Sequence, residues 1–330
     1  MPQPDTIGLY GDFWTRFLLM LLRLFPAWFC VAATWPLAII FYCLAAPQRR
    51  VVMANLRGLR PKSSGFALWW GGCRVFAQFA LTYMDRLWSQ HLRKPICPQF
   101  RDRDELIEQL AKPGGVLLFT THSGNYDIGA ELFAQAFTRP IHVVRIPERT
   151  KGLQQFRAAE LSASESRNSN LRIHYVRDEW SLGLELCRLL ESGEVVAVQG
   201  DRGVPGSAQT VIEHEGMLFR LPRGPLILAA ISKVPCYAVF ITRAARCAYE
   251  FRSAPAFYKG GAACTDEDIG RAWLTQMAPF VREHWDQWYI FDEPVVGAFE
   301  AELPACDSRL QTGATDSFAR ARNVFEASSR

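Results

Sequence analysis

A long apolar segment lies near the start of the chain. Residues 24–46, LFPAWFCVAATWPLAIIFYCLAA, carry no charge over 23 residues, which is long enough to cross a bilayer. Pro26 and Pro36 allow a second arrangement, in which the segment bends into an interfacial or re-entrant hairpin. A buried core helix is a third alternative, which the two prolines and the large aromatic residues disfavour. We expect membrane attachment, and leave open whether the segment spans the bilayer.

The charge that follows this segment predicts its orientation. The sequence PQRRVVMANLRGLRPK brings five basic residues close behind the apolar run: Arg49, Arg50, Arg57, Arg60 and Lys62. Basic residues beside a membrane segment stay in the cytoplasm, where anionic lipids also attract them. We therefore expect the rest of the chain on the cytoplasmic side of the membrane.

Apolar spacing beyond residue 63 predicts one or two amphipathic helices over 64–92, and then a regular alternation of strands and helices. The predicted strands are 115–121, 141–146, 172–176, 194–199 and 236–242, and the helices are 127–137, 179–192, 224–233 and 266–288. Short apolar strands separated by helices indicate an α/β fold with a mostly parallel sheet covered on both faces. We predict a membrane anchor over 1–47, a catalytic domain over 48–298 and a polar tail over 299–330.

Composition narrows the class of protein only slightly. The net charge is +4, which is too small for the basic surface of a nucleic-acid-binding protein. Thirty-one of the 37 basic residues are Arg, a side chain that binds phosphate and carboxylate in a bidentate manner, although genomic base composition explains the bias equally well. The nine Cys residues show no C-x-x-C pair and mostly apolar neighbours, so we expect reduced thiols and no zinc site.

The stretch LLFTTHSGNYDIGAEL, residues 117–132, runs from a predicted strand through a polar turn into a predicted helix. His122 and Asp127 would lie on nearly opposite sides of one continuous helix, so the two can meet only if the SGNY segment turns the chain. Gly124 suits such a turn, and Ser123 or Asn125 can cap the helix. In that arrangement Asp127 accepts a hydrogen bond from one imidazole nitrogen and leaves the other as a base. The structural alternative is that Asp127 only favours the helix N-terminus and His122 is an ordinary residue at a strand end.

Five segments together resemble one protein family. THSGNYDIG is similar to the T-H-x-G-N-W-E-L block of the bacterial lipid A biosynthesis late acyltransferases, within the glycerolipid-type acyltransferases that carry His-x4-Asp/Glu. The resemblance extends to four further segments in the same order: PQRRVVMANL, VVAVQGDRG, EGMLFRLPRGPLILAAISKVP and VREHWDQWYIFD. It covers about residues 15–293 and implies a glycerol-3-phosphate acyltransferase-like fold.

The resemblance implies roles for particular residues. His122 would be the general base and Asp127 its orienting partner, while Asn125 would fix the geometry of the turn. The remaining candidates are substrate-binding residues, with Arg202 suited to a phosphate of either substrate and the start of the helix near 224 suited to an anion or oxyanion: Arg145, Asp201, Arg202, Gly216, Arg220, Arg223 and Gly224.

The implied reaction is transfer of a fatty acyl chain from a thioester to a hydroxyl of a lipid A precursor or a related glycolipid. Acyl carrier protein is the expected donor, with coenzyme A as a possible one, and no metal or bound cofactor is expected. His214 and Glu215 stand where the family has aromatic residues, and His284 where it often has Pro. These departures bear on the acceptor, so acylation of a lysophospholipid or an amino-acid-containing lipid is an alternative.

A different class of function is a catalytically silent membrane scaffold that keeps the fold. The presence of both His122 and Asp127 argues against it. A serine hydrolase is disfavoured because the chain contains no G-x-S-x-G elbow.

Overall fold

The computed structural model describes residues 12–145, 162, 170–175, 179–203 and 206–297. The described residues up to Gly297 belong to one unit. The predicted tail, 299–330, lies outside the described residues. The predicted division at residue 47, between an anchor and a catalytic domain, stays a prediction.

Four helices form the N-terminal part of the chain: α1 (Asp12–Leu24), α2 (Ala27–Leu44), α3 (Ala46–Leu59) and α4 (Gly65–Leu92). Pro26 is the residue before α2, and Pro36 lies inside that helix. The side chain of Ser64 accepts a hydrogen bond from the amide of Ala67 and so begins α4, which runs unbroken for 28 residues. The region 64–92 is therefore one helix, the first of the two alternatives that its spacing allowed.

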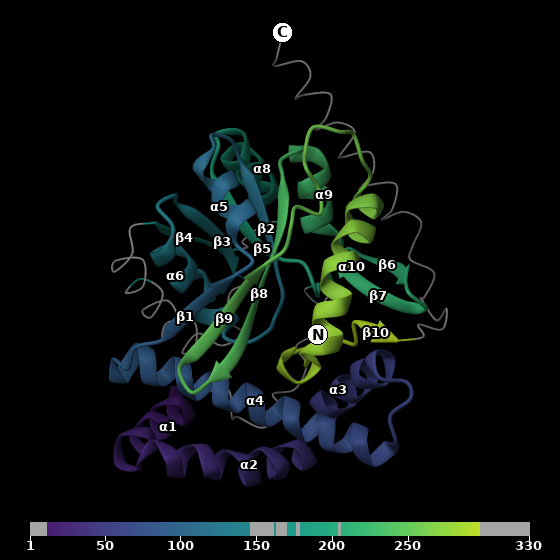
Figure 1. The fold of residues 1–330 in the computed structure, drawn as a ribbon. Helices are drawn as coiled ribbons and strands as arrows, with labels where there is room; N and C mark the ends of the chain where they lie inside the picture. The colour runs from purple at the N-terminus through teal and green to yellow at the C-terminus, as the bar shows by residue number, and fades with distance from the viewer. Residues whose placement is uncertain (1–11, 146–161, 163–169, 176–178, 204–205, 298–330) are drawn as a thin grey trace. The chain divides into compact units, whose positions relative to one another are not determined.

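The central sheet has seven strands in the order β1-β9-β8-β2-β5-β3-β4, and all neighbouring pairs are parallel except β8 with β9 (Figure 1). This confirms the α/β fold with a mostly parallel sheet. The strands are β1 (Cys97–Arg101), β2 (Val116–Thr120), β3 (Ile141–Arg145), β4 (Leu171–Tyr175), β5 (Val195–Gln199), β8 (Cys236–Ala245) and β9 (Ala248–Ser253).

Alternation along the strands explains why both faces are covered. In β2, Leu117 and Phe119 face one side, where they pack against α8 (Glu179–Glu191), α9 (Arg223–Ser232) and α10 (Asp266–Glu283). Val116 and Leu118 face the other side, against α5 (Asp104–Ala111) and α6 (Tyr126–Ala136). A strand buried on both faces is apolar at every position, which is why β2 reads as a continuous apolar run.

Three strands form a separate small sheet: β6 (Gln209–His214), β7 (Met217–Pro222) and β10 (Val296–Gly297). The helix predicted over 266–288 ends at Glu283 as α10, and a short 3-10 helix, η1 (Trp285–Gln287), follows it. The residues after η1 return to the central sheet and reach the turn that follows β2.

Candidate active site

The polar turn after β2 is held by a segment more than 160 residues later in the chain. The amide of Tyr289 donates to the carbonyl of His122, and the amide of Gly124 donates to the carbonyl of Gln287. Gly124 has φ of 50°, and a Cβ there would lie 2.5 Å from the carbonyl oxygen of Ile241. Both facts require glycine, so the expectation that Gly124 permits the turn is confirmed.

His122 lies at this turn and its imidazole is oriented by Asp201. Its Nδ1 is 2.7 Å from Oδ1 of Asp201, and its backbone amide donates to Oδ2 of the same carboxylate at 2.7 Å. Asp201 follows β5, which pairs in parallel with β2, so the carboxyl ends of the two strands bring the residues together across 79 positions of sequence. The expected position of Asp201 and Arg202 beside the turn is confirmed.

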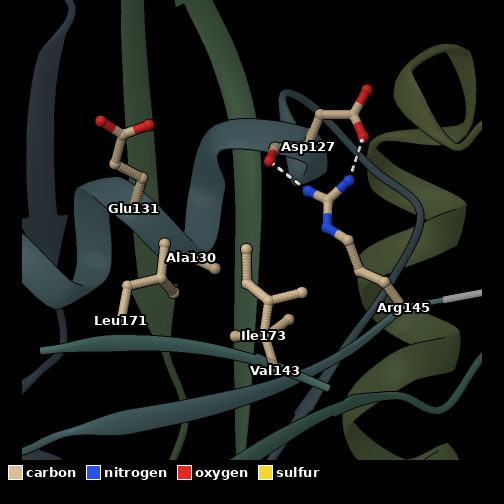
Figure 2. Close-up of a pocket in the computed structure, with 7 residues that line it drawn as sticks. All are labelled: Asp127, Ala130, Glu131, Val143, Arg145, Leu171 and Ile173. Carbon is tan, nitrogen blue, oxygen red and sulfur yellow. Dashed lines mark hydrogen bonds and ion pairs between the residues drawn. The ribbon is translucent and has the colours of Figure 1, made fainter. Parts of the chain in front are cut away.

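The predicted hydrogen bond between His122 and Asp127 is wrong. Asp127 lies in the first turn of α6, and its carboxylate accepts hydrogen bonds from Arg86 at 2.8 Å and from Arg145 at 3.2 Å. Figure 2 shows the guanidinium of Arg145 reaching both the carboxylate and the main-chain oxygen of Asp127. The carboxylate is thus directed toward two guanidinium groups, while the ring of His122 is engaged by Asp201.

Asp127 and Asp201 are both ionised in this arrangement. Burial acts to raise the pKa of Asp127, but Arg86 and Arg145 outweigh it and hold that pKa below its usual range. Burial also acts to raise the pKa of Asp201, but the electrostatic interaction with His122 and the hydrogen bonds from His122 and from the indole of Trp288 outweigh it and lower that pKa. Because Asp201 accepts from Nδ1–H, the other imidazole nitrogen carries the lone pair.

That second nitrogen faces Arg202. The Nε of Arg202 donates to Nε2 of His122 at 3.1 Å, while its Nη1 pairs with Asp292. Burial lowers the pKa of His122 below 6.5, and the positive charge of Arg202 lowers it further against the opposing effect of Asp201. The imidazole is therefore neutral at pH 7, with Nε2 in the state a general base requires.

Several polar contacts that hold this site were not predicted from the sequence. The indole Nε1 of Trp288 donates to Oδ2 of Asp201 at 2.8 Å. Asn125 does not cap α6 with its side chain; its Nδ2 donates instead to the carbonyl of Thr82 on α4 and to the hydroxyl of Tyr249. Asn125 thus links the turn to α4, consistent with a role in fixing its geometry.

Comparison with known proteins identifies the family. The model of the bacterial lipid A biosynthesis acyltransferases matches residues 4–293, which is most of the chain. The chain belongs to this family. The resemblance found in the sequence is thereby confirmed. A search of curated proteins found no match.

The candidates around the start of α9 lie on a different part of the acyltransferase fold. Gly216 is in the turn of the β6–β7 hairpin, where its amide donates to Glu213, and Arg220 is in β7, where its amide donates to Val295. Arg223 begins α9 and its side chain pairs with Asp266 at the start of α10, with Gly224 next in the helix. None of the hydrogen bonds just described involves His122, and the substrate-binding roles of these residues remain predictions.

Two of the three residues that depart from the family pattern lie at the β6–β7 hairpin. Glu215 is in the exposed hairpin turn and pairs with Arg282 of α10, and His214 is the last residue of β6. A small hollow adjoins Asp127; its lining is Asp127, Ala130, Glu131, Val143, Arg145, Leu171 and Ile173 (Figure 2). Among the described residues no cluster of His, Cys, Asp and Glu is placed to hold a metal ion.

Proposed function

We propose that this acyltransferase transfers a fatty acyl chain from an acyl thioester to a hydroxyl of a lipid A precursor or a closely related glycolipid, with His122 as the general base. The family supports acyl transfer in lipid A biosynthesis. The donor, the acceptor and the roles of individual residues are the proposed parts.

The observation that carries the mechanism is the pair of contacts on the His122 ring. Asp201 accepts from Nδ1–H, so Nε2 is the basic nitrogen, and the low pKa of the imidazole keeps it unprotonated. In the reaction Nε2 removes the proton of the acceptor hydroxyl as its oxygen attacks the thioester carbonyl. The tetrahedral intermediate then expels the thiolate, which takes up the proton from His122. Such a step is worth about 10²- to 10⁴-fold in rate.

The guanidinium of Arg202 donates to Nε2 of His122, so the acceptor hydroxyl must displace it. An anionic phosphate on either substrate is a suitable new partner for that guanidinium. Displacement of this kind would expose the base only when a phosphorylated substrate is present. We assign Arg202 to substrate binding on this basis.

The test is an acyl-transfer assay with one donor on acyl carrier protein and a panel of acceptors: lipid A precursors, lysophospholipids and amino-acid-containing lipids. Transfer to the lipid A precursors supports the proposed acceptor, and transfer only to another lipid class replaces it. The variant His122→Gln keeps the volume of the side chain and removes the base, so we expect a fall of at least about 10²-fold in kcat. Unchanged activity in this variant would remove the mechanism.

Acyl carrier protein is the donor we propose, because an acidic carrier matches an Arg-rich acyltransferase. We expect higher ionic strength to raise KM for the carrier-bound donor more than for a short-chain thioester, since only the former depends on long-range attraction. An equal response of both donors would contradict a carrier-protein contact. Localisation on the cytoplasmic face of the inner membrane is part of the same proposal.

A further inference from the structure

Exposed apolar side chains are concentrated on the N-terminal helices. Most of the large apolar residues that the structure leaves exposed lie on α1, α2 and the first turns of α4. We call these side chains the apolar face; it includes Phe25, Trp28, Leu37, Phe66, Trp69 and Trp70. Trp28 is 70% exposed and Phe66 is 76% exposed, values that are unusual for such side chains in contact with water alone.

The apolar face is continuous from one helix to the next. The rings of Trp35 on α2 and Trp70 on α4 stack with centroids 6.3 Å apart, and Trp69 stacks on Phe66 at 6.2 Å. The patch therefore extends from α2 onto α4 as one surface. A patch of this extent on a folded chain indicates a binding surface for another apolar phase or partner.

The direction of α2 follows from its packing. One described helix, α2, is long and apolar enough to cross a membrane. Its buried stripe, Cys30, Thr34, Ala38 and Tyr42, recurs every four residues. Tyr42 is fully buried and packs edge-on against Phe76 of α4, and Thr34 contacts Met84 of α4. These contacts, at the middle of α2 and near its C-terminal end, place the helix lengthwise along α4 (Figure 1).

The opposite side of α4 is bonded to the rest of the protein. Asp85 is fully buried and accepts hydrogen bonds from Arg243 and Tyr249 of the central sheet. Arg86, which is 1% exposed, donates to Asp127 at the start of α6. Because α4 lies against the sheet, α2 cannot cross a bilayer in this structure without taking α4 and its buried charges into the hydrocarbon.

The positive charge of the N-terminal helices indicates which partner the apolar face binds. Between Asp12 and Asp85 the sequence contains no acidic residue and eight Arg and Lys residues. A surface that combines exposed aromatic residues with positive charge is complementary to an anionic lipid bilayer. An acidic protein would match the positive charge, but it would not supply the hydrocarbon phase into which the apolar side chains insert.

We propose that α1, α2 and the start of α4 lie in the plane of the membrane and insert the apolar face into one leaflet of an anionic bilayer, so that α2 is an in-plane anchor and does not span. Both ends of α2 then face the same side of the membrane. Helix α4 also forms hydrogen bonds with Asn125 and Asp127. It therefore connects the apolar face in the lipid to the turn that carries His122.

Sidedness is tested with an impermeant polyethylene glycol maleimide on inverted and right-side-out membrane vesicles. Arg23→Cys lies before α2 and Arg50→Cys after it, and both positions are exposed. Each variant is compared with its parent, so native cysteines contribute equally. We expect both variants to gain one adduct in inverted vesicles. A gain on opposite sides would show that α2 spans and would overturn the proposal.

Contact with lipid is tested by photo-crosslinking in vesicles of phosphatidylglycerol and phosphatidylethanolamine that contain radiolabelled phospholipid. Benzoylphenylalanine replaces Phe66 on α4 or, as a matched control, Leu184 on α8, which is also exposed. We expect several-fold more label at position 66 than at position 184, and more with anionic lipid than with neutral lipid alone. Equal labelling at both positions would overturn the proposal. Neither readout depends on acyl transfer, so failure of the proposed reaction leaves both measurements valid.

Discussion

Replacing Asp201 by Asn tests the orientation of His122 with almost no change in shape. The two oxygens of the carboxylate have different partners. Oδ1 accepts from Nδ1 of His122, and Oδ2 accepts from the backbone amide of His122 and the indole of Trp288. In the variant, the single amide oxygen must choose between these positions. At the Oδ2 position this oxygen would accept from two buried donors, the backbone amide of His122 and the indole of Trp288, and at the Oδ1 position from one, Nδ1 of His122.

The preferred orientation of the amide gives the imidazole the wrong tautomer. If the oxygen stays at the Oδ2 position, the NH₂ group donates to Nδ1 and the proton moves to Nε2, which then loses its hydrogen bond from Arg202 and can no longer act as a base. The reverse orientation leaves two buried N–H groups unsatisfied, at about 1–3 kcal/mol each. The productive tautomer is then disfavoured by roughly 2–6 kcal/mol, which corresponds to a loss of about 30-fold or more. The equivalent change in the Ser-His-Asp triad costs about 10⁴-fold, which sets the upper end.

The measurement is kcat for thiol release during acyl transfer by Asp201→Asn, with circular dichroism and thermal unfolding to confirm that the fold is retained. Asp127→Asn is the matched control, because it removes a carboxylate from the same turn without altering the partner of Nδ1. We expect kcat to fall by about 30- to 10⁴-fold in Asp201→Asn, as worked out above, and to be affected much less in the control once the folded fraction is taken into account. A near-normal kcat in Asp201→Asn together with loss in Asp127→Asn would refute the assignment and restore Asp127 as the orienting residue.

Three further results are expected. Asp127→Asn should lower the free energy of unfolding by about 1–3 kcal/mol, because a neutral amide replaces the charged acceptor of the hydrogen bonds from Arg86 and Arg145; combining it with Arg86→Met should recover part of that loss, and additive effects in chemical denaturation would contradict the pairing. Arg202→Gln removes a positive charge that lowers the pKa of His122, so the acidic limb of the kcat/KM profile should move to higher pH; an unmoved limb would show that Arg202 does not act on the base. Gly124→Ala places a Cβ against a backbone carbonyl in a left-handed conformation, so we expect a loss of at least about 1 kcal/mol in thermal unfolding and reduced kcat, whereas wild-type values would contradict the geometry of the turn.

Local pattern predicted much of the sheet. The five predicted strands correspond to β2, β3, β4, β5 and β8 within a few residues, because four of them contain an apolar run bounded by polar or Gly-Pro segments and β4, LRIHY, alternates apolar and polar residues. The strands β1, β6, β7, β9 and β10 were not predicted. They are short, and β1, β6 and β9 mix polar with apolar residues, so their pairing depends on neighbours rather than on local apolarity.

The sequence by itself determined the position of His122 at a strand end, the need for Gly124 in the turn, the family and the apolar N-terminal segment. Only the tertiary structure decided which carboxylate meets the imidazole. Asp127 is five residues away, but the helix start directs it toward Arg86 and Arg145, whereas parallel pairing of β2 with β5 brings Asp201 to Nδ1. Spacing along the chain constrains only local geometry, while hydrogen bonds between distant residues depend on strand order and packing, which no short motif contains.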